Sequence, residues 1–325
     1  MASPPVVVVT RPLPAPGVEP LRAAGLEVRA NDEDRPLTRD ELLAAVADAD
    51  AVVSMLSDRI DAELLDAAPR LKVVANYAVG FDNVDVAEAV RRGVEVTTTP
   101  DVLSEATADL AWALLMAAAR RVGEGERLVR AGEWRGPAPT QLLGQPVGGR
   151  TLGIVGMGAI GQAFARRARG FSMPIVYFNR NRLPGELEEE LGARYVPLDE
   201  LLTTSDFVSL HAPLNDDSRH MIDAAALARM KPTAVLVNTA RGALVDEAAL
   251  VVALSEGRIA AAGLDVYERE PALAEGLAEL DDVVLTPHVG SATTNTRAAM
   301  VRLCVDNVVE VLAGRPAVTP APRPT

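Results

Sequence analysis

The sequence contains a single cysteine, Cys304, so the chain cannot form an internal disulfide or a cysteine-rich metal site. Aromatic residues make up only 3% of its 325 residues, and alanine, leucine and valine therefore have to fill the core. No apolar run approaches the ~20 residues that a membrane-spanning helix requires. The N-terminus lacks the basic start and long apolar segment of a signal peptide, and we expect a cytoplasmic protein without a metal.

Positive charge is also scarce. The net charge is −13 at pH 7, and lysine occurs only at Lys72 and Lys231, so arginine supplies nearly all of the positive charge. An acidic chain does not attract nucleic acid or anionic membranes, and we expect neither as a partner. It would also mildly repel a small anionic substrate. Any site for such a substrate must therefore rely on local arginines and backbone N–H groups.

The chain is rich, by contrast, in short apolar runs that alternate with helical patterns. The region 151–182 opens with a run of strand length, continues with three glycines at G-x-G-x-x-G spacing and a helical pattern, and closes with a second apolar run. This strand–helix–strand order predicts a dinucleotide site, with the helix N-terminus facing the phosphates. A plain glycine-rich turn is the alternative interpretation. The expected cofactor contacts are Gly156, Gly158, Ala159, Ile160 and Gly161.

The end of the second strand bears on which nicotinamide cofactor binds. A site that prefers NAD usually has an acid roughly 20 residues past the glycines, bound to the ribose hydroxyl. Here the strand ends in Asn179, Arg180, Asn181 and Arg182, and no acid occurs before Glu186. Arginine binds phosphate oxygens bidentately, so these residues favour the 2′-phosphate of NADPH, with NADH less preferred. A solvated surface loop is the alternative.

The remaining runs indicate two α/β domains. Apolar runs at 6–9, 51–56, 71–78 and 94–99, with helical patterns between them, predict a small parallel sheet over residues 1–98. Six further runs over 99–289 predict a doubly wound parallel-sheet (Rossmann) cofactor domain. The Ala-rich segment 104–121 predicts a helix buried nearly all round.

Several chemically active residues follow strands at the edge where doubly wound sheets bind ligands. The three histidines, His211, His220 and His288, could all lie there, so position alone does not choose among them, and a lone histidine is more often structural. Arg241 follows one further strand and acids follow another. An arginine that holds a carboxylate, a histidine that protonates a carbonyl oxygen and an acid that fixes the imidazole would suit reduction of a 2-keto acid.

The motifs resemble those of the D-isomer-specific 2-hydroxyacid dehydrogenases over nearly the whole chain. The matching segments are 156–161, 209–213, 237–242, 263–266, 270–271 and 287–292. Within that family, segments 75–84, 99–109 and 288–293 most resemble the glyoxylate and hydroxypyruvate reductases. The resemblance implies reduction of glyoxylate to glycolate and of hydroxypyruvate to D-glycerate, with hydride from NADPH.

The resemblance also implies residue roles. Arg241 would bind substrate, Glu270 would pair with the histidine, and His288 would donate the proton. Further cofactor contacts would come from Thr107, His211, Thr239, Ala240, Arg241, Asp265, His288 and Gly290. Leu56, Ser57, Val79 and Gly80 would contact the substrate, together with Arg241 and His288. Arg269 departs from the family pattern, because an acid is common there.

The implied organisation is a flavodoxin-like substrate domain, residues 1–98 and 290–325, and the cofactor domain at 99–289. Residues 122–150 would form an arm that wraps the partner of a homodimer. A dehydrogenase for a bulkier 2-keto acid and phosphite oxidation are the enzymatic alternatives. A non-catalytic nucleotide-sensing binding protein of the same fold is the alternative from another class.

Overall fold

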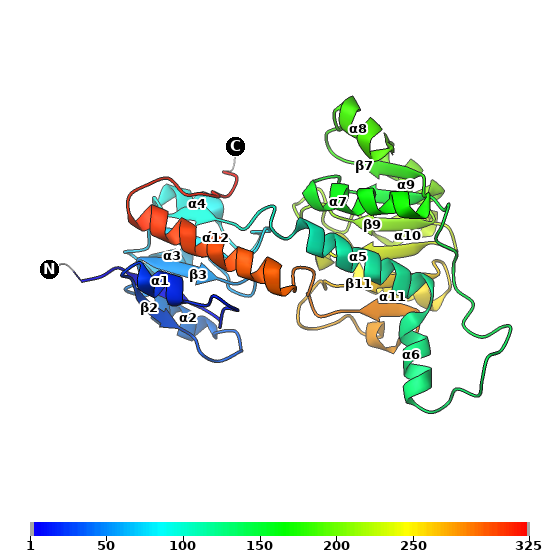
Figure 1. Ribbon diagram of the computed structural model, residues 1–325, viewed down its shortest axis with the longest axis horizontal. Coiled ribbons are helices and arrows are strands. Elements are labelled where there is room, and N and C mark those ends of the chain that lie inside the picture. Colours follow the sequence, from blue (N-terminus) through cyan, green and yellow to red (C-terminus); the bar gives the residue numbers. More distant parts are fainter. Residues whose placement is uncertain (1–2, 324–325) are drawn as a thin grey trace. The chain divides into compact units, whose positions relative to one another are not determined.

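The computed structural model describes residues 3–323 and divides them into two compact units (Figure 1). The terminal unit contains both ends of the chain, up to Leu103 and again from Ser291 onwards. The central unit spans Ser104–Gly290. Each unit has its own parallel sheet with helices around it.

The sheet of the terminal unit has five parallel strands in the order β2-β1-β3-β4-β5, which is the flavodoxin-like order. β1, β3 and β4 are buried throughout, as their β-branched runs predict, whereas β2 lies at the edge and is partly exposed. The sequence patterns did not predict β2. The strands are β1 (Val6–Val9), β2 (Glu27–Ala30), β3 (Ala51–Ser54), β4 (Val73–Asn76) and β5 (Glu95–Thr97).

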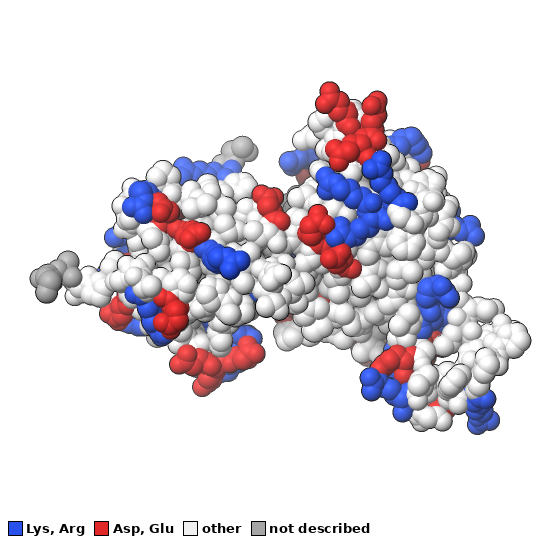
Figure 2. Space-filling model, in the orientation of Figure 1, with Lys and Arg blue, Asp and Glu red and all other residues white. Residues whose placement is uncertain are grey.

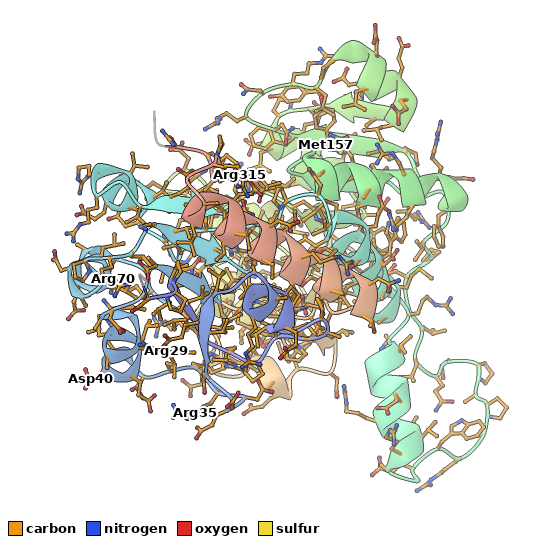
Figure 3. The ribbon with its side chains drawn as sticks, turned by 60° about the vertical axis from the view of Figure 1, so that its left-hand side comes forward. Arg29, Arg35, Asp40, Arg70, Met157 and Arg315 are labelled. Atoms are coloured by element: carbon orange, nitrogen blue, oxygen red, sulfur yellow. The ribbon has the colours of Figure 1, made fainter. Side chains whose placement is uncertain are left out.

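Side-chain caps start four of the described helices of the terminal unit, and the cap of α12 is Thr293. Thr38 and Glu41 form a reciprocal capping box at the start of α2, and Asp61 and Asp85 cap α3 and α4. Figure 3 labels Arg35, whose guanidinium binds both carboxylate oxygens of Glu41 at 2.7 and 2.8 Å. The helices are α1 (Glu19–Ala23), α2 (Arg39–Val46), α3 (Ala62–Ala67), α4 (Val86–Arg91) and α12 (Thr294–Leu312).

Helix α12 joins the C-terminal segment to this unit. The hydroxyl of Tyr77, just after β4, donates to the carbonyl of Arg297 at 2.9 Å. Beyond the helix, the N–H of Ala321 donates to Val96 of β5, so this part of the chain is paired with the sheet. Cys304 is buried in α12, and burial raises the pKa of its thiol to about 12.

The sheet of the central unit has seven parallel strands in the order β12-β11-β10-β9-β6-β7-β8. Counted from β6, this is the 3-2-1-4-5-6 order of dinucleotide-binding folds with one strand added. The sequence predicted six of these strands and missed the three-residue edge strand β8. The strands are β6 (Leu152–Val155), β7 (Ile175–Phe178), β8 (Ala193–Tyr195), β9 (Phe207–Leu210), β10 (Val235–Asn238), β11 (Ala261–Leu264) and β12 (Val283–Leu285).

Helix α5 is the most buried helix of the central unit. The ring of Trp112 stacks on Phe164 and on Phe171, with centroids 5.0 and 4.8 Å away. A Cβ on Gly263 would lie 2.9 Å from that of Leu114, so this glycine lets α5 pack closely on β11. The helices are α5 (Ser104–Ala119), α6 (Val122–Arg130), α7 (Ala159–Ala168), α8 (Gly185–Leu191), α9 (Leu198–Thr204), α10 (Ala224–Arg229) and α11 (Glu247–Ser255), with 3-10 turns η1 (Arg169–Phe171), η2 (Gly242–Leu244) and η3 (Leu277–Glu279).

Over residues 3–323, no helix combines the length and the apolar character needed to cross a membrane. In the same described residues, no group of three or more His, Cys, Asp or Glu side chains is arranged to hold a metal ion.

Candidate active site

Three glycines build the turn between β6 and α7, each for a different steric reason. A Cβ on Gly156, whose φ is +94°, would lie 2.5 Å from the backbone N of Ala212. A Cβ on Gly161 would lie 2.2 Å from the carbonyl oxygen of Gly156, so α7 packs directly on its own turn. A Cβ on Gly158, the N-cap of α7, would meet no atom within 4 Å. The helix N-terminus is therefore open to a close-approaching phosphate.

The residues after β7 take different positions around this turn. The side-chain oxygen of Asn179 accepts a hydrogen bond of 2.7 Å from the N–H of Met157, which Figure 3 labels. Asn179 therefore holds the glycine turn through its side chain. Arg180 and Asn181, in contrast, are exposed.

Arg182 forms an ion pair with Glu188 of α8. Its Nε and Nη2 donate to the carboxylate of Glu188 at 2.9 and 2.7 Å. The Arg182 guanidinium and the Tyr177 hydroxyl, 2.6 Å away, lower the pKa of Glu188 to about 2. Tyr177 also accepts from the N–H of Leu183 at 2.8 Å, so the cluster fixes the loop between β7 and α8. Figure 2 shows acidic side chains gathered over α8 and basic ones over α7.

His288 and Glu270 form a pair beyond the carboxyl ends of β12 and β11. Nδ1 of His288 lies 2.8 Å from Oε2 of Glu270, and Oε1 of Glu270 accepts from the N–H of Tyr267 at 3.0 Å. Burial acts to raise the pKa of Glu270, but His288, this N–H and the charge of Arg241 outweigh it and lower that pKa. Glu270 is therefore an ionised partner for one ring nitrogen, which leaves Nε2 of His288 to exchange a proton with a ligand.

Hydrogen bonds fix the backbone of His288 as well as its ring. Its φ is +54°, a conformation that residues with a Cβ rarely adopt. Its N–H donates to the carbonyls of Asp265 at 2.8 Å and Thr286 at 3.1 Å. The ring direction is therefore set from both ends, by the backbone and by Glu270.

Arg241 follows β10 at the same edge of the sheet. The side chain of Asn238 donates to the carbonyl of Arg241 at 2.8 Å and accepts from the N–H of Ala240 at 3.0 Å, which fixes the turn. Nη1 of Arg241 donates to the carbonyl of Ala240 at 2.8 Å. The hydroxyl oxygen of Thr239 is buried with no hydrogen-bond partner among residues 3–323. A bound polar ligand is one way to satisfy such a group.

Asp265 is fully buried where β11 ends. Its carboxylate accepts from the Thr286 hydroxyl at 2.6 Å and from the N–H groups of Val289 and Gly290 at 2.8 Å each. Burial raises the pKa of Asp265 despite these donors. A Cβ on Gly290 would lie 3.3 Å from both Asp265 Oδ2 and Thr107 Cγ2, so Thr107 adjoins this cluster. Three donors leave the carboxylate one acceptor position for a ligand N–H.

The other two histidines have other partners. Nε2 of His211 lies 2.9 Å from the Ser209 hydroxyl, and desolvation lowers the pKa of its ring to about 3, so this histidine is neutral at ordinary pH. Nε2 of His220 lies 2.7 Å from Glu268. Of the three histidines, only His288 is paired with Glu270 beside Arg241.

The substrate residues expected in the terminal unit lie on the turns that follow β3 and β4. Leu56 and Ser57 lie in the turn after β3, with Ser57 exposed, and Val79 and Gly80 follow β4 and are partly exposed. Both turns lie at the carboxyl edge of their parallel sheet, the edge where such sheets bind ligands.

The chain matches the model of the NAD-binding domain of D-isomer specific 2-hydroxyacid dehydrogenases over residues 112–290. It is 56% identical to the glyoxylate reductase of Thermococcus onnurineus over 309 residues, which are 94% of this chain and 92% of that one. The chain belongs to this dehydrogenase family. The resemblance seen in the sequence is thereby confirmed, and the protein is an oxidoreductase that uses a nicotinamide cofactor.

Two solved structures share the fold of this dehydrogenase. A Thermus thermophilus protein is 46% identical, with a TM-score of 0.92, over 98% of this chain and 100% of that one. An NADPH-dependent glyoxylate/hydroxypyruvate reductase of Sinorhizobium meliloti, solved with NADP and malonate, is 36% identical, with a TM-score of 0.85, over 98% of this chain and 97% of that one. The expected α/β architecture with two parallel sheets is confirmed.

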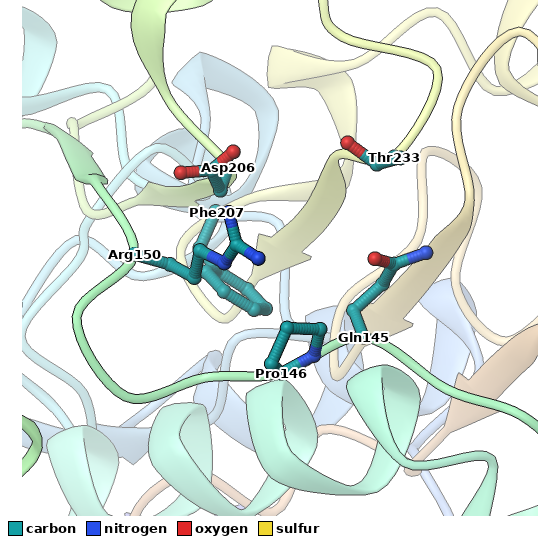
Figure 4. Close-up of a pocket in the computed structure, with 6 residues that line it drawn as sticks. All are labelled: Gln145, Pro146, Arg150, Asp206, Phe207 and Thr233. Carbon is teal, nitrogen blue, oxygen red and sulfur yellow. The ribbon is translucent and has the colours of Figure 1, made fainter.

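A pocket at the opposite edge of the central sheet does not belong to the dehydrogenase site. Figure 4 shows its lining, which includes Phe207 at the start of β9 and Thr233 just before β10. It therefore lies at the amino ends of the strands, and at about 90 Å³ it is far too small for a dinucleotide.

Sequence reasoning missed the contacts that place Glu270 near Arg241 in the dehydrogenase site. A Cβ on Gly242 would lie 1.9 Å from the carbonyl carbon of Tyr267, so the Arg241 turn is pressed against the segment that carries Glu270. The N–H of Glu268 donates to buried Glu247 at 2.6 Å. The sequence shows only a glycine at position 242, without any sign of what lies against it.

Proposed function

We propose that this dehydrogenase reduces glyoxylate to glycolate and hydroxypyruvate to D-glycerate, with NADPH preferred over NADH. The observation that carries the proposal is the Glu270–His288 pair, with the Arg241 charge close enough to act on Glu270. A general acid supported by a carboxylate, beside a guanidinium, is suited to a small 2-keto acid. The name of the Thermococcus relative supports glyoxylate, and that of the Sinorhizobium structure supports hydroxypyruvate and NADPH.

The residues of the central unit fit a dinucleotide. The space next to Gly158 at the start of α7 suits a pyrophosphate, and the unpartnered hydroxyl of Thr239 suits a polar group of the ligand. When bound, the cofactor supplies the hydride. The residues proposed to hold it are Gly156, Gly158, Ala159, Ile160, Gly161, Thr107, Asn179, Arg180, Asn181, Arg182, His211, Thr239, Ala240, Arg241, Asp265, His288 and Gly290.

The protein's own part in the reaction is binding and proton transfer. Arg241 holds the carboxylate of the 2-keto acid through charge-assisted hydrogen bonds, so that the keto group is oriented toward the histidine. Nε2 of His288 donates its proton to the keto oxygen, while Glu270 keeps Nδ1 protonated and the ring in place. The terminal unit would act as the substrate domain, with Leu56, Ser57, Val79 and Gly80 contributing to recognition of the substrate.

The NADPH preference rests chiefly on Arg180. This residue is exposed at the end of β7, whereas Arg182 is bound to Glu188 through Nε and Nη2. Nη1 of Arg182 remains for an additional phosphate oxygen. Asn179 acts through the turn by holding Met157. The acid of an NAD-preferring site is absent from this stretch of sequence.

We also infer a homodimer formed through residues 122–150. Helix α6 has no buried residue, and apolar side chains in this segment are exposed, among them Trp134 at 53% and Leu143 at 68%. Contiguous exposed apolar surface is typical of a protein interface, and a second copy of this chain would cover it. Light scattering coupled to gel filtration should give twice the mass of the chain, and a Trp134→Glu variant should shift toward monomer.

One substrate panel tests the proposed activity. Glyoxylate, hydroxypyruvate and bulkier 2-keto acids would each be mixed with the protein and either NADPH or NADH, and loss of the reduced cofactor's absorbance recorded. We expect the highest kcat/KM with glyoxylate or hydroxypyruvate and NADPH. A preference for a bulkier acid would change the substrate assignment. Cofactor binding without turnover of any 2-keto acid would favour a nucleotide-sensing protein.

A further inference from the structure

The two turns that follow β3 and β4 in the terminal unit are joined by side-chain amides. Nδ2 of Asn83 donates to the carbonyls of Met55 at 3.1 Å and Asp58 at 2.9 Å, which close the turn after β3. The same nitrogen lies 3.2 Å from Oδ1 of Asn76, the last residue of β4. One amide group therefore closes the first turn and ties it to the start of the second.

Asn76 continues this connection into the second turn. Its side chain is fully buried, and Nδ2 donates to the carbonyl of Gly80 at 2.8 Å. Its Oδ1 also accepts from the hydroxyl of Ser54, at the end of β3, at 3.3 Å. The peptide that follows Gly80 is thus fixed in one orientation, and with it the turn that presents the N–H groups of Val79 and Gly80.

A buried acid supports the first turn from its other side. Asp58 is 2% exposed, and its Oδ2 accepts from the N–H of Met55 at 2.7 Å and from the hydroxyl of Thr10, just after β1, at 2.5 Å. Asp58 therefore links the segments that follow the carboxyl ends of β1 and β3. In sheets of this strand order, ligands bind at the point between those two strands.

The amide group of Asn83 has one polar atom whose hydrogen-bonding capacity is not satisfied within the described residues. Its Oδ1 is buried with no hydrogen-bond partner among residues 3–323. An unpaired buried acceptor lowers stability, so this asparagine costs the fold free energy. A role in holding the turns for a ligand is consistent with that cost.

We propose that Asn83 and Asn76 are positioning residues for substrate binding. They hold the two turns so that the backbone N–H groups of Val79 and Gly80, with Ser57 nearby, receive the carboxylate of the 2-keto acid without rearranging. Donors that are already fixed bind an anion more tightly, because no ordering entropy is lost on binding. This matters in a chain with a net charge of −13, which attracts anions poorly. The proposal rests on the proposed function.

The test is an Asn83→Ala variant. It removes the donor to both carbonyls of the first turn and leaves the backbone N–H groups of the second in place. We expect KM for glyoxylate to rise about tenfold or more, and kcat to stay within about threefold, because the lost interaction acts in the ground state and the transition state alike. The Kd for NADPH should not change, because the proposed cofactor residues all belong to the central unit.

Thr38→Ala provides the matched control. Thr38 caps α2 in the same unit, so its loss lowers stability, but among residues 3–323 it forms no hydrogen bond to either turn. We expect wild-type KM for this variant. If Asn83→Ala does not fold, Asn83→Ser, which keeps a short donor, replaces it and should show a smaller rise in KM.

Hydrogen exchange gives a second measure that does not depend on turnover. The amides of residues 77–80 should exchange faster in Asn83→Ala than in the wild-type protein, with the central unit unchanged. A folded Asn83 variant with wild-type KM and wild-type exchange would overturn the proposal, as would an equal rise in KM in Thr38→Ala. A wild-type protein that turns over no 2-keto acid would instead refute the proposed function, while exchange would still report on the turns.

Discussion

Replacing Glu270 by glutamine isolates the charge that acts on His288. The variant keeps the size of the side chain and an oxygen that can accept from Nδ1 of His288, 2.8 Å away in the wild type. It removes only the negative charge. The pKa of Glu270 is lowered, so the wild-type residue is ionised throughout the range of an enzyme assay.

The structure sets the size of the expected effect. A hydrogen bond to a charged group contributes about 1.5–3 kcal/mol. The His288 and Glu270 side chains are 33% and 36% exposed, so solvent screens the pair and the lower value applies. About 1.4 kcal/mol corresponds to a tenfold change in rate. The Glu270 carboxylate stabilises the positive charge of the ring that donates the proton, so kcat should fall about tenfold in Glu270→Gln.

The assay is the initial rate of NADPH oxidation with saturating glyoxylate and NADPH. Glu268→Gln is the matched control, since it makes the same chemical change two residues earlier, where the carboxylate binds His220. We expect Glu268→Gln to keep a kcat close to that of the wild type. A wild-type kcat in Glu270→Gln, or an equal loss in both variants, would contradict a role for the Glu270 charge.

Three further predictions concern Arg241, Gly242 and the acid stability of the Glu270 pair. Arg241→Lys should raise KM for glyoxylate about 10- to 100-fold when NADPH is saturating, because lysine cannot bind a carboxylate bidentately; an unchanged KM would exclude Arg241 as the carboxylate ligand. Gly242→Ala would place a Cβ 1.9 Å from the Tyr267 backbone, and thermal denaturation should show a loss of about 1–3 kcal/mol or more; wild-type stability would contradict the tight contact. Because the pKa of Glu270 is lower in the folded protein, its contribution to stability is present above about pH 4.3 and is lost as the pH falls through the lower folded value. The difference in unfolding free energy between wild type and Glu270→Gln should therefore shrink below that pH, and a constant difference would count against the pairing.

The sequence predicts the strands that carry the site because their signals are local. A β-branched run such as Val6–Val9 can be recognised from neighbouring residues alone, and so can the glycine turn after β6. The edge strands β2 and β8 were missed because they are short and partly exposed, so they lack a buried apolar run. The same holds for α6, which has two glycines and no buried residue.

Side-chain partners were much harder to predict than strands. Strand positions alone do not choose among the three histidines. The family motifs indicate His288 and Glu270, and the fold shows the contact itself, with Nδ1 of His288 2.8 Å from Glu270. Nothing in the pattern indicates that Arg182 would bind Glu188, because an arginine near an acid in sequence is common and its rotamer depends on the loop. No local pattern indicated the contacts of Asn83, since Met55 and Asp58, which its amide binds, belong to the turn after β3.

Proton donation by His288 is tested most directly by comparing wild-type protein with His288→Asn in the reduction of glyoxylate by NADPH, at cofactor concentrations that saturate each protein. We expect the wild type to oxidise NADPH with formation of glycolate. We expect His288→Asn still to bind NADPH through the remaining cofactor contacts, and to have a kcat lower by roughly 10²- to 10⁴-fold, the usual contribution of a general acid. A wild-type rate in the variant, or no oxidation of NADPH by the wild type with any small 2-keto acid, would contradict it.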